Sequence, residues 1–244
     1  MHAPASRPDP VLVVHETHTV AGVEEEAFEA AWRDGFLPAL GVDDSARLLH
    51  FLHQAHGSGP AYTVVTLTAV RDAAAWEALA GRLRDGDLAA WVADVDGLRH
   101  DHQAKVLAPL PFSPLQDLDL ASIPAEPQDH AQVLFMEDTA WPYRGKYEAY
   151  LEKAGTLYLE TLAANAGRSL LGLEAAFSPV WGTDRRREIV LWQRVVKPEA
   201  LPGLFSHDVP AEYRGPGTWM HDALEVRDRW ESRLLRSAPW SPVA

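Results

Sequence analysis

The chain has 244 residues, 47% of them hydrophobic and 23% charged, which fits a globular protein with one large domain or two of about 120 residues. It contains no cysteine, which excludes disulfides, thiolate metal sites and cysteine nucleophiles. Its net charge of −13 argues against nucleic acid or an anionic membrane as the main partner. Without a signal-peptide pattern or an apolar run of ~20 residues, the sequence predicts a soluble cytoplasmic protein.

The first half of the chain predicts four strands and three helices. Residues 1–10 are expected to be a flexible, proline-rich leader. An apolar strand begins at Val11 and continues through His15 and Glu16, and a helix over 23–40 carries aromatic residues at helical spacing. The elements expected next are strands over 47–56 and 61–70, a helix over 72–84, a shorter helix from residue 88, and a strand over 102–108.

The second half repeats this order after a proline-rich linker over 115–130. The elements expected there are a strand over 131–139, a long helix over 144–166, strands over 169–180 and 188–196, a short helix over 198–205, a helix from residue 219 and a terminal strand. The same sequence of elements therefore occurs twice in one chain.

The closing stretch of the chain also has an earlier copy. Residues 219–242 align without a gap with residues 91–114, and seven positions are identical. About one or two identities are expected by chance at ordinary composition. Lys105 and Arg233 keep a cation at matching positions. The copy indicates an internal duplication. A signature that occurs in both halves, such as its Trp and Arg, is interpreted as structural, with the tryptophans packing helix on sheet.

The predicted fold class is α+β, with two tandem ferredoxin-like β-α-β-β-α-β repeats over 11–114 and 131–244. Such a unit covers one face of its antiparallel sheet with helices and leaves the other face bare. Two bare faces in one chain can pack against each other or close into a barrel-like core. We therefore expect an internal cavity between the sheets.

These features resemble the dimeric α+β-barrel superfamily in a single-chain tandem form, and most of all its NIPSNAP group. The resemblance rests on an acidic first strand in each repeat and on a helix that passes through an arginine into a strand ending with proline, at 99–114 and 227–242. The superfamily includes cofactor-free monooxygenases, polyketide cyclases, isomerases, lactone-forming enzymes and haem proteins. The resemblance thus implies a fold more than a single function.

The first candidate site lies on the two first strands. When the repeats are aligned, His15 falls opposite Glu137 and Glu16 opposite Asp138. Because neighbouring residues on a strand point to opposite faces, one pair faces the helices and the other the space between the sheets. A histidine and a carboxylate in an enclosed cavity form an acid–base pair. The alternative is a set of solvated or arginine-paired side chains at the strand ends.

Further catalytic and binding candidates lie on the second and third strands. His53 and its approximate counterpart Glu174 repeat the histidine and carboxylate combination. Trp192 and Arg194 share one strand face, where an aromatic ring beside a cation can hold a planar acidic ligand. His221, which replaces an alanine of the first copy, is a further substrate-binding candidate. For each of these residues a structural role is the alternative.

Two cofactor alternatives remain open at this stage. Haem would take an axial ligand from His207 or His221, by analogy with haem proteins of the resembling superfamily. A divalent metal would use histidines of the second strand, among His50, His53 and His56, or the pair His100 and His102, with a carboxylate. Alternation along the strand separates His53 from the other two histidines, so these three cannot all bind one metal.

The leading hypothesis is a small-molecule enzyme that uses an enclosed, aromatic-rich pocket and acid–base residues on a hydrophobic, aromatic or polyketide-like substrate. It would be a cyclase, isomerase or monooxygenase without a nucleotide cofactor, because the G-x-G-x-x-G and G-x-x-x-x-G-K-[ST] motifs are absent, as are G-x-S-x-G and H-E-x-x-H. The alternatives are a haem- or metal-binding protein and a non-catalytic ligand-binding or scaffold protein. A homodimer is compatible with each of them.

Overall fold

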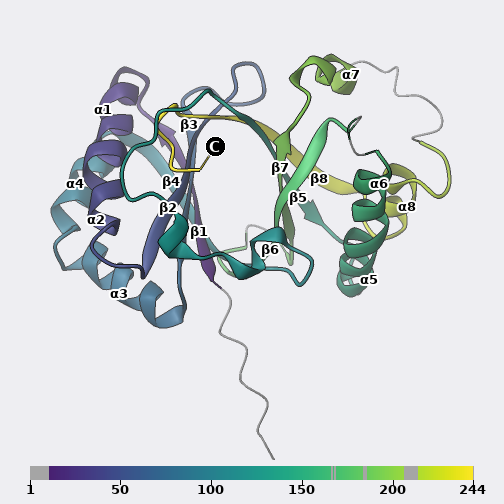
Figure 1. Ribbon diagram of the computed structural model, residues 1–244, viewed down its shortest axis with the longest axis horizontal. Helices are drawn as coiled ribbons and strands as arrows, with labels where there is room; N and C mark the ends of the chain where they lie inside the picture. The colour runs from purple at the N-terminus through teal and green to yellow at the C-terminus, as the bar shows by residue number, and fades with distance from the viewer. Residues whose placement is uncertain (1–10, 166, 168, 184–185, 206–213, 244) are drawn as a thin grey trace, which may run out of the picture.

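The computed structural model describes residues 11–165, 167, 169–183, 186–205 and 214–243 (Figure 1). Residues 1–10, the expected leader, lie outside this part of the chain. The described strands form a closed barrel in the order β1-β3-β2-β8-β5-β7-β6-β4. Figure 1 looks into this ring, with α1 to α4 on its left flank and α5, α6 and α8 on its right.

The first repeat supplies four strands and the helices of one flank. Its elements are β1 (Leu12–Val20), α1 (Glu25–Ala30), α2 (Leu37–Leu40), β2 (Ala46–Gln54), β3 (Thr63–Val70), α3 (Ala73–Arg84), α4 (Ala89–Asp96) and β4 (Arg99–Pro109). Asp72 caps α3, because its side chain accepts a hydrogen bond from the backbone N–H of Ala75.

The second repeat follows the same order. Its elements are β5 (Leu134–Trp141), α5 (Tyr147–Lys153), α6 (Leu159–Ala164), β6 (Leu171–Trp181), β7 (Ile189–Val195), α7 (Pro202–Phe205), α8 (Trp219–Asp222) and β8 (Arg229–Ser237). The prediction of two tandem ferredoxin-like repeats that form a barrel-like core is confirmed. None of the described helices is both long enough and apolar enough to cross a membrane.

Each of the two long helices contains a π-helical turn that the sequence did not predict. The turns span Ala31–Phe36, between α1 and α2, and Ala154–Tyr158, between α5 and α6. Each contains a glycine under an aromatic ring: a Cβ on Gly35 would lie 3.0 Å from Trp91, and one on Gly155 would lie 3.0 Å from Phe112. The glycines let the rings approach the widened turns closely, so the expected continuous helices are interrupted at matching places.

The barrel closes at two junctions between the repeats. The first repeat contributes β4-β1-β3-β2 and the second β8-β5-β7-β6, and β2 pairs with β8 while β4 pairs with β6. In a ring of eight strands β1 and β5 are four places apart, so they face each other across the lumen. Side chains that point inward from these two strands therefore meet on the barrel axis.

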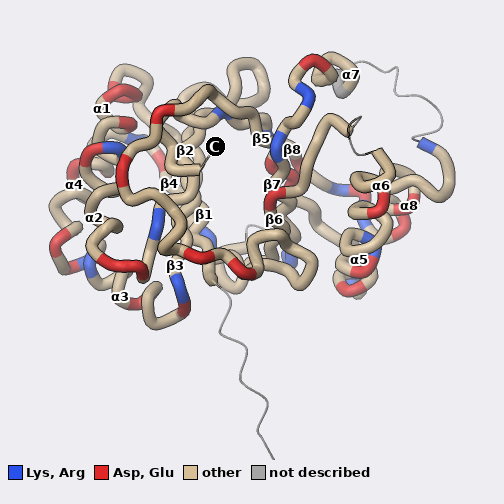
Figure 2. Tube along the Cα trace, in the orientation of Figure 1, with Lys and Arg blue, Asp and Glu red and all other residues tan. Residues whose placement is uncertain are grey.

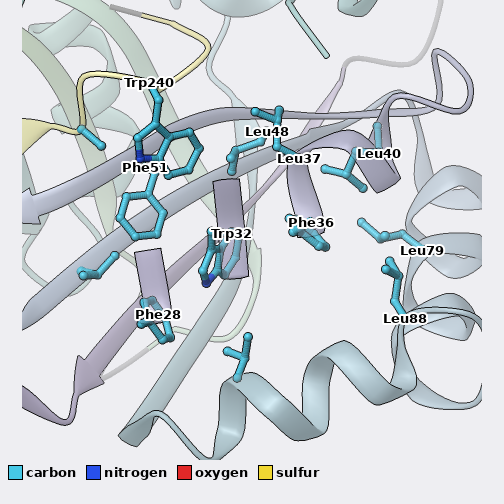
Figure 3. Packing of buried hydrophobic residues seen from close by; sticks show 14 of the residues in the cluster. Phe28, Trp32, Phe36, Leu37, Leu40, Leu48, Phe51, Leu79, Leu88 and Trp240 are labelled. Carbon is cyan, nitrogen blue, oxygen red and sulfur yellow. The ribbon is translucent and has the colours of Figure 1, made fainter. Parts of the chain in front are cut away.

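Three apolar clusters follow from the alternation along the strands. One fills the space between the first sheet and α1 to α4, and Figure 3 shows its rings Phe28, Trp32 and Phe36 below Phe51 and Trp240. A second lies under the helices of the other flank. The third fills the lumen with inward residues of both repeats: Val13, Leu49, Leu67, Leu107, Phe135, Phe177, Trp192 and Leu235 are among them.

The linker between the repeats and the C-terminal tail close one end of the lumen. Leu115, Leu118, Leu120, Ile123 and Val243 pack against the apolar cluster inside the barrel. The opposite end, where β1 and β5 finish and β8 begins, leads to a cavity. We call this open end the mouth of the barrel.

The repeated Pro-x-Ser-Pro ends of the two copies form matching clasps across the junctions. Ser113 Oγ accepts a hydrogen bond of 2.9 Å from the backbone N–H of Ala176 in β6, and Leu110 N–H donates to the carbonyl of Ala176 at 2.8 Å. In the second copy Ser241 and Ala238 make the same two bonds to Phe51 in β2, at 3.2 and 3.0 Å. Each repeat thus satisfies backbone groups of the other, which agrees with the structural interpretation of the signature.

The tryptophans of that signature belong to the clusters that pack the helices on the sheet, where each also contacts other helices. Trp91 lies against the rings of Trp32 and Phe36, at centroid distances of 5.2 and 4.6 Å, and donates Nε1–H to the carbonyl of Ala31 at 2.9 Å. It therefore also joins one helix to another. Trp219 likewise meets two helix tyrosines.

The acidic excess of the chain is spread over the molecule. Asp and Glu outnumber Lys and Arg by 35 to 22. Figure 2 shows acidic residues on the helices of both flanks and on the segments at the ends of the barrel. The negative charge therefore does not define one docking surface.

Candidate functional site

His15 and Glu137 meet inside the barrel. Both side chains point inward, from β1 and β5, and His15 Nε2 lies 3.0 Å from Glu137 Oε2 across the lumen. Both residues are 1% exposed. Arg233 donates from Nη2 to Glu137 Oε1 at 2.7 Å and from Nη1 to Thr17 Oγ1 at 3.2 Å. The pair forms a polar crossbar, the His15–Glu137 contact, above the apolar cluster of the lumen.

The charge state of the crossbar follows from its surroundings. Burial lowers the pKa of His15 and outweighs the opposing pull of Glu137, so the imidazole is neutral at neutral pH. Burial by itself would raise the pKa of Glu137, but Arg233 and His15 hold that pKa well below its usual value. Glu137 is therefore an ionised carboxylate that accepts a hydrogen bond from the Nε2–H group of the neutral His15.

The crossbar floors a cavity of about 410 Å³ that opens at the mouth of the barrel. A second buried pair stands in its wall, where Lys105 Nζ contacts Glu188 Oε1 at 2.8 Å and Trp141 Nε1 donates to Glu188 Oε2 at 3.0 Å. At the mouth Gly182 has φ of +87°, and a Cβ there would lie 2.7 Å from the carbonyl oxygen of Ala104. The lining residues are His15, Thr17, Gln103, Ala104, Lys105, Glu137, Thr139, Trp141, Gly182, Glu188, Glu231 and Arg233. We call this the mouth cavity.

A second cavity, of about 420 Å³, lies between the first sheet and its helices. Its walls are mostly apolar and include four aromatic rings, from the π-helical turn, α3 and α4. The lining residues are Glu16, Trp32, Phe36, Trp76, Ala80, Leu83, Arg84, Trp91, Val92, Asp96, Arg99 and His102. We call this the aromatic pocket. It shares none of its lining residues with the mouth cavity.

A chain of hydrogen bonds runs along the polar edge of the aromatic pocket. His102 Nε2 contacts Glu16 Oε1 at 2.8 Å, and Thr66 Oγ1 donates to Glu16 Oε2 at 3.4 Å. His18 Nε2 lies 3.3 Å from Thr66 Oγ1, and Arg99 Nη1 lies 2.8 Å from His18 Nδ1. Because Arg99 can only donate, His18 accepts at Nδ1 and donates from Nε2. The bonds thus point from Arg99 through His18 and Thr66 toward Glu16.

The protonation states along this chain agree with its direction. Burial lowers the pKa of His18 to about 3, so its imidazole stays neutral. Burial would raise the pKa of Glu16, but the hydrogen bond from His102 and the nearby cationic groups hold it below its usual value. Glu16 is therefore a partly buried carboxylate beside the exposed His102, at the edge of an aromatic cavity. Such a pair can take a proton from a bound molecule.

The predicted pair Glu16 and Asp138 faces the helices, each in its own repeat. Asp138 contacts Ser232 and Gln193, with Oδ1 and Oδ2 at 2.5 and 2.9 Å from their donors. Burial raises its pKa. Tyr158 donates to Gln193, and ring packing fills the space around them. Asp138 therefore lies among packed side chains, away from both cavities.

The remaining strand candidates do not join either site. His53 faces the helices and contacts Glu29 at 2.8 Å and Glu25 at 3.3 Å. Glu174 and Arg194 pair at 2.7 Å near the closed end of the lumen. Trp192 is buried there against His50 and Phe135. The residues that were singled out from the sequence therefore divide among several places in the fold.

The described residues do not form a haem site at His221. This side chain lies on the surface of α8 with Nδ1 2.8 Å from Asp222 Oδ1. Beneath it Trp219 packs on Tyr150 and Tyr158 at centroid distances of 5.7 and 5.0 Å, so rings fill that space. His207 lies outside the described residues. No group of three or more His, Asp or Glu within the described chain is arranged to hold a metal ion.

Several residues of the two cavities were not singled out from the sequence. Lys105 lies directly across from His15 on the neighbouring strand, and Arg233 lies directly across from Glu137. The strand alternation that points His15 and Glu137 into the lumen therefore also points the two cations there. The conserved cation at the two matching positions was the available signal. The sequence held no comparable signal for Glu188, because this residue precedes β7 at the end of a turn. The aromatic pocket was hidden because its walls come from three helices.

Comparison with known proteins shows the fold alone. No protein-family model and no curated protein matches the sequence. A candidate monooxygenase from Lactobacillus acidophilus is 12% identical and superposes with a TM-score of 0.60 over 93% of this chain and 94% of its own. An anthrone oxidase-like protein is 8% identical, with a TM-score of 0.59 over 94% and 92%. The chain thus has the dimeric α+β-barrel fold in tandem form, as the resemblance implied.

The half-chain likeness concerns the NIPSNAP group. An uncharacterised NIPSNAP domain protein from Burkholderia xenovorans is 23% identical and covers 42% of this chain and 98% of its own, with a TM-score of 0.35. At identities this low, similarity of fold does not indicate similarity of function.

Proposed function

We propose that the chain is an enzyme that removes a proton from a hydrophobic, fused-ring aromatic molecule bound in the aromatic pocket. The observation that carries this proposal is the contact between Glu16 and His102, 2.8 Å long, at the polar edge of a cavity walled by aromatic rings. Apolar walls with a few polar groups at one edge are usual for small-molecule sites. The volume of about 420 Å³ lies within the usual range of ~300–1,000 Å³.

In this proposal Glu16 and His102, at the polar edge of the aromatic pocket, each have a defined role. Glu16 holds the Nε2 proton of His102, so Nδ1 of His102 accepts the proton of the substrate, and the carboxylate stabilises the resulting imidazolium. Thr66 keeps Glu16 oriented by donating a hydrogen bond to its second oxygen, and His18 in turn donates to the hydroxyl of Thr66. Trp32, Phe36 and Trp91 stack against the rings of the substrate.

We further propose that the deprotonated substrate reacts with dissolved O₂, without a nucleotide cofactor. For an anthrone, loss of the proton gives an anion that O₂ oxidises. One oxygen atom forms the new carbonyl in place of the two hydrogens of the methylene group, and the other leaves with those hydrogens as water. Support comes from the full-length fold likeness to a candidate monooxygenase and to an anthrone oxidase-like protein.

Oxygen uptake with anthrone as substrate tests this proposal. The variants Glu16→Gln and His102→Gln should each lower kcat by about 100-fold, because general-base catalysis contributes ~10²–10⁴ in rate. Glu126→Gln, which changes an exposed carboxylate of the linker, is the matched control and should keep the wild-type rate. Circular dichroism confirms that the variants are folded.

The outcomes separate the competing functions. Folded variants that retain the wild-type rate would refute the base assignment. Conversion of an aromatic substrate without oxygen uptake would indicate cyclase or isomerase chemistry at the same pair. Binding of anthrone without any conversion would favour a ligand-binding protein.

A further inference from the structure

The mouth cavity has a different chemistry from the aromatic pocket. Ten of its twelve lining side chains carry nitrogen or oxygen, and only Ala104 and Gly182 do not. It lies inside the barrel, and both repeats build it: His15 and Lys105 come from the first, Glu137, Glu188 and Arg233 from the second. A hydrophobic substrate would leave the remaining donors of Lys105 and Arg233 and the acceptor of His15 without hydrogen bonds, which is costly in a buried site. The mouth cavity therefore calls for a ligand of its own.

Its charges exclude strongly charged ligands. The two fully buried carboxylates each already have a cation, Glu137 with Arg233 and Glu188 with Lys105. A third carboxylate, Glu231, lines the opening and lies 3.7 Å from Arg229. An entering anion must compete with the buried carboxylates for Lys105 and Arg233. An entering cation finds both interior carboxylates engaged. A neutral ligand avoids both costs.

The hydrogen-bonding groups favour a ligand with many hydroxyls. Lys105 donates to Glu188 from one of its three N–H groups, and Arg233 contacts Glu137 and Thr17 from two of its five. With the Nε2 proton engaged by Glu137, Nδ1 of His15 is an acceptor that bonds to no described residue. The cavity thus offers donors and an acceptor together, and hydroxyl groups satisfy both kinds.

The walls add one apolar surface and two neutral polar groups. Trp141 lines the cavity while its Nε1–H is engaged by Glu188, so its ring can face the C–H groups of a saturated ring. Gln103 and Thr139 supply an amide and a hydroxyl, and neither side chain bonds to a described residue. The volume of about 410 Å³ suits a molecule of one or two six-membered rings.

We propose that the mouth cavity is a second site, which binds a neutral, hydroxyl-rich ring molecule such as a sugar or cyclitol. His15 Nδ1 accepts one ligand hydroxyl, and Lys105 and Arg233 donate to its oxygens. The His15–Glu137 crossbar forms the floor on which the ligand rests. This proposal does not depend on the function of the aromatic pocket.

Titration followed by protein NMR tests the proposal with four probes: glucose and myo-inositol as neutral ligands, glucuronate as the anion and glucosamine as the cation. Saturable shifts of the Trp141 indole N–H are expected with a neutral probe, and at least about five-fold weaker binding with the charged probes. Thr139→Val and Gln103→Ala should each weaken binding of the neutral probe about five-fold, the usual effect of one neutral hydrogen bond. Gln128→Ala, at an exposed glutamine of the linker, is the matched control and should leave binding unchanged.

Several results would overturn the second site. These are no saturable shift with either neutral probe, tighter binding of glucuronate or glucosamine, and equal binding by Thr139→Val, Gln103→Ala and the control. Both cavity variants change groups without described side-chain bonds, so each should fold. Glu16→Gln should leave the binding of neutral probes unchanged. Loss of anthrone turnover in that variant then tests the aromatic pocket separately.

Discussion

Two histidines of β1 show how a shift of three residues changes the chemistry of a side chain. His15 points into the lumen and meets Glu137, whereas His18 points toward the helices and lies between Arg99 and Thr66. Both are neutral because burial lowers their pKa values. One strand therefore supplies the floor of the mouth cavity with one face and the polar edge of the aromatic pocket with the other.

A buried neutral histidine makes the stability of the protein depend on pH. Burial lowers the pKa of His50 to about 3, and its Nδ1 lies 3.1 Å from the carbonyl of Val243. The unfolded chain binds a proton at this residue below about pH 6.5, whereas the folded chain does not until about pH 3. Stability is therefore lost as the pH falls through this window, by about 1.4 kcal/mol per pH unit for one such group.

The variant His50→Gln isolates this effect, because glutamine keeps a donor for Val243 and does not titrate. Urea unfolding between pH 4 and pH 6 should show a slope of stability against pH that is smaller by about 1.4 kcal/mol per pH unit than in the wild type. Above pH 7 the two curves should run parallel, which is the internal control. Parallel curves over the whole range would contradict the account.

At the scale of elements, the clasps explain why the last residues of each repeat look alike. β4 and β8 are each followed by a Pro-x-Ser-Pro segment, whose serine accepts a hydrogen bond from the backbone of the other repeat, at Ala176 and at Phe51. The sequence predicted a structural role from the duplication but not the partner, because the partner strand belongs to the other repeat. The π-helical turns had no signal in the spacing of apolar residues, since Gly35 and Gly155 act only through rings that pack on them.

Removal of a clasp hydroxyl should destabilise the barrel. Ser113→Ala and Ser241→Ala each leave a buried backbone N–H without a partner, which costs about 1–3 kcal/mol. The clasps sit at different junctions, so the double variant should lose the sum of the two effects. Urea unfolding measures each loss. Ser122→Ala, at an exposed serine of the linker, is the control and should change stability by less than about 0.5 kcal/mol. A double variant no less stable than either single one would contradict independent clasps.

At the scale of the whole molecule, local patterns predicted the elements and the duplication predicted their two-fold arrangement. Strand alternation predicted that one of the two pairs on β1 and β5 faces the space between the sheets, but not that His15 and Glu137 touch across it. That contact depends on the ring order, which places β1 opposite β5. The two cavities could not be predicted, because each collects residues from elements far apart in the sequence. Charge complementarity between the repeats emerges only at this scale.

The two repeats should recognise each other when they are produced as separate chains. The inward face of the first sheet is apolar at Val13, Leu67 and Leu107, so a fragment of residues 1–125 should pair its exposed sheet rather than remain a monomer. In a dimer of two copies of this fragment, His15 and Lys105 would face the same residues of the other copy. In a mixed dimer with the fragment 126–244, they would face the carboxylates of Glu137 and Glu188. Mixing the two fragments should therefore give mainly the mixed dimer, as measured by native mass spectrometry.

The charge pairs predict how this preference can be removed. With Glu137→Gln and Glu188→Gln in the second fragment, His15 and Lys105 lose their partners, and the mixed dimer should fall toward the statistical half of all dimers. An exposed pair of changes in the same fragment, Glu148→Gln and Glu160→Gln, is the control and should keep the preference. A folded monomer of residues 1–125, or a mixed dimer that forms equally well with and without the two carboxylates, would show that the crossbar does not select the partner.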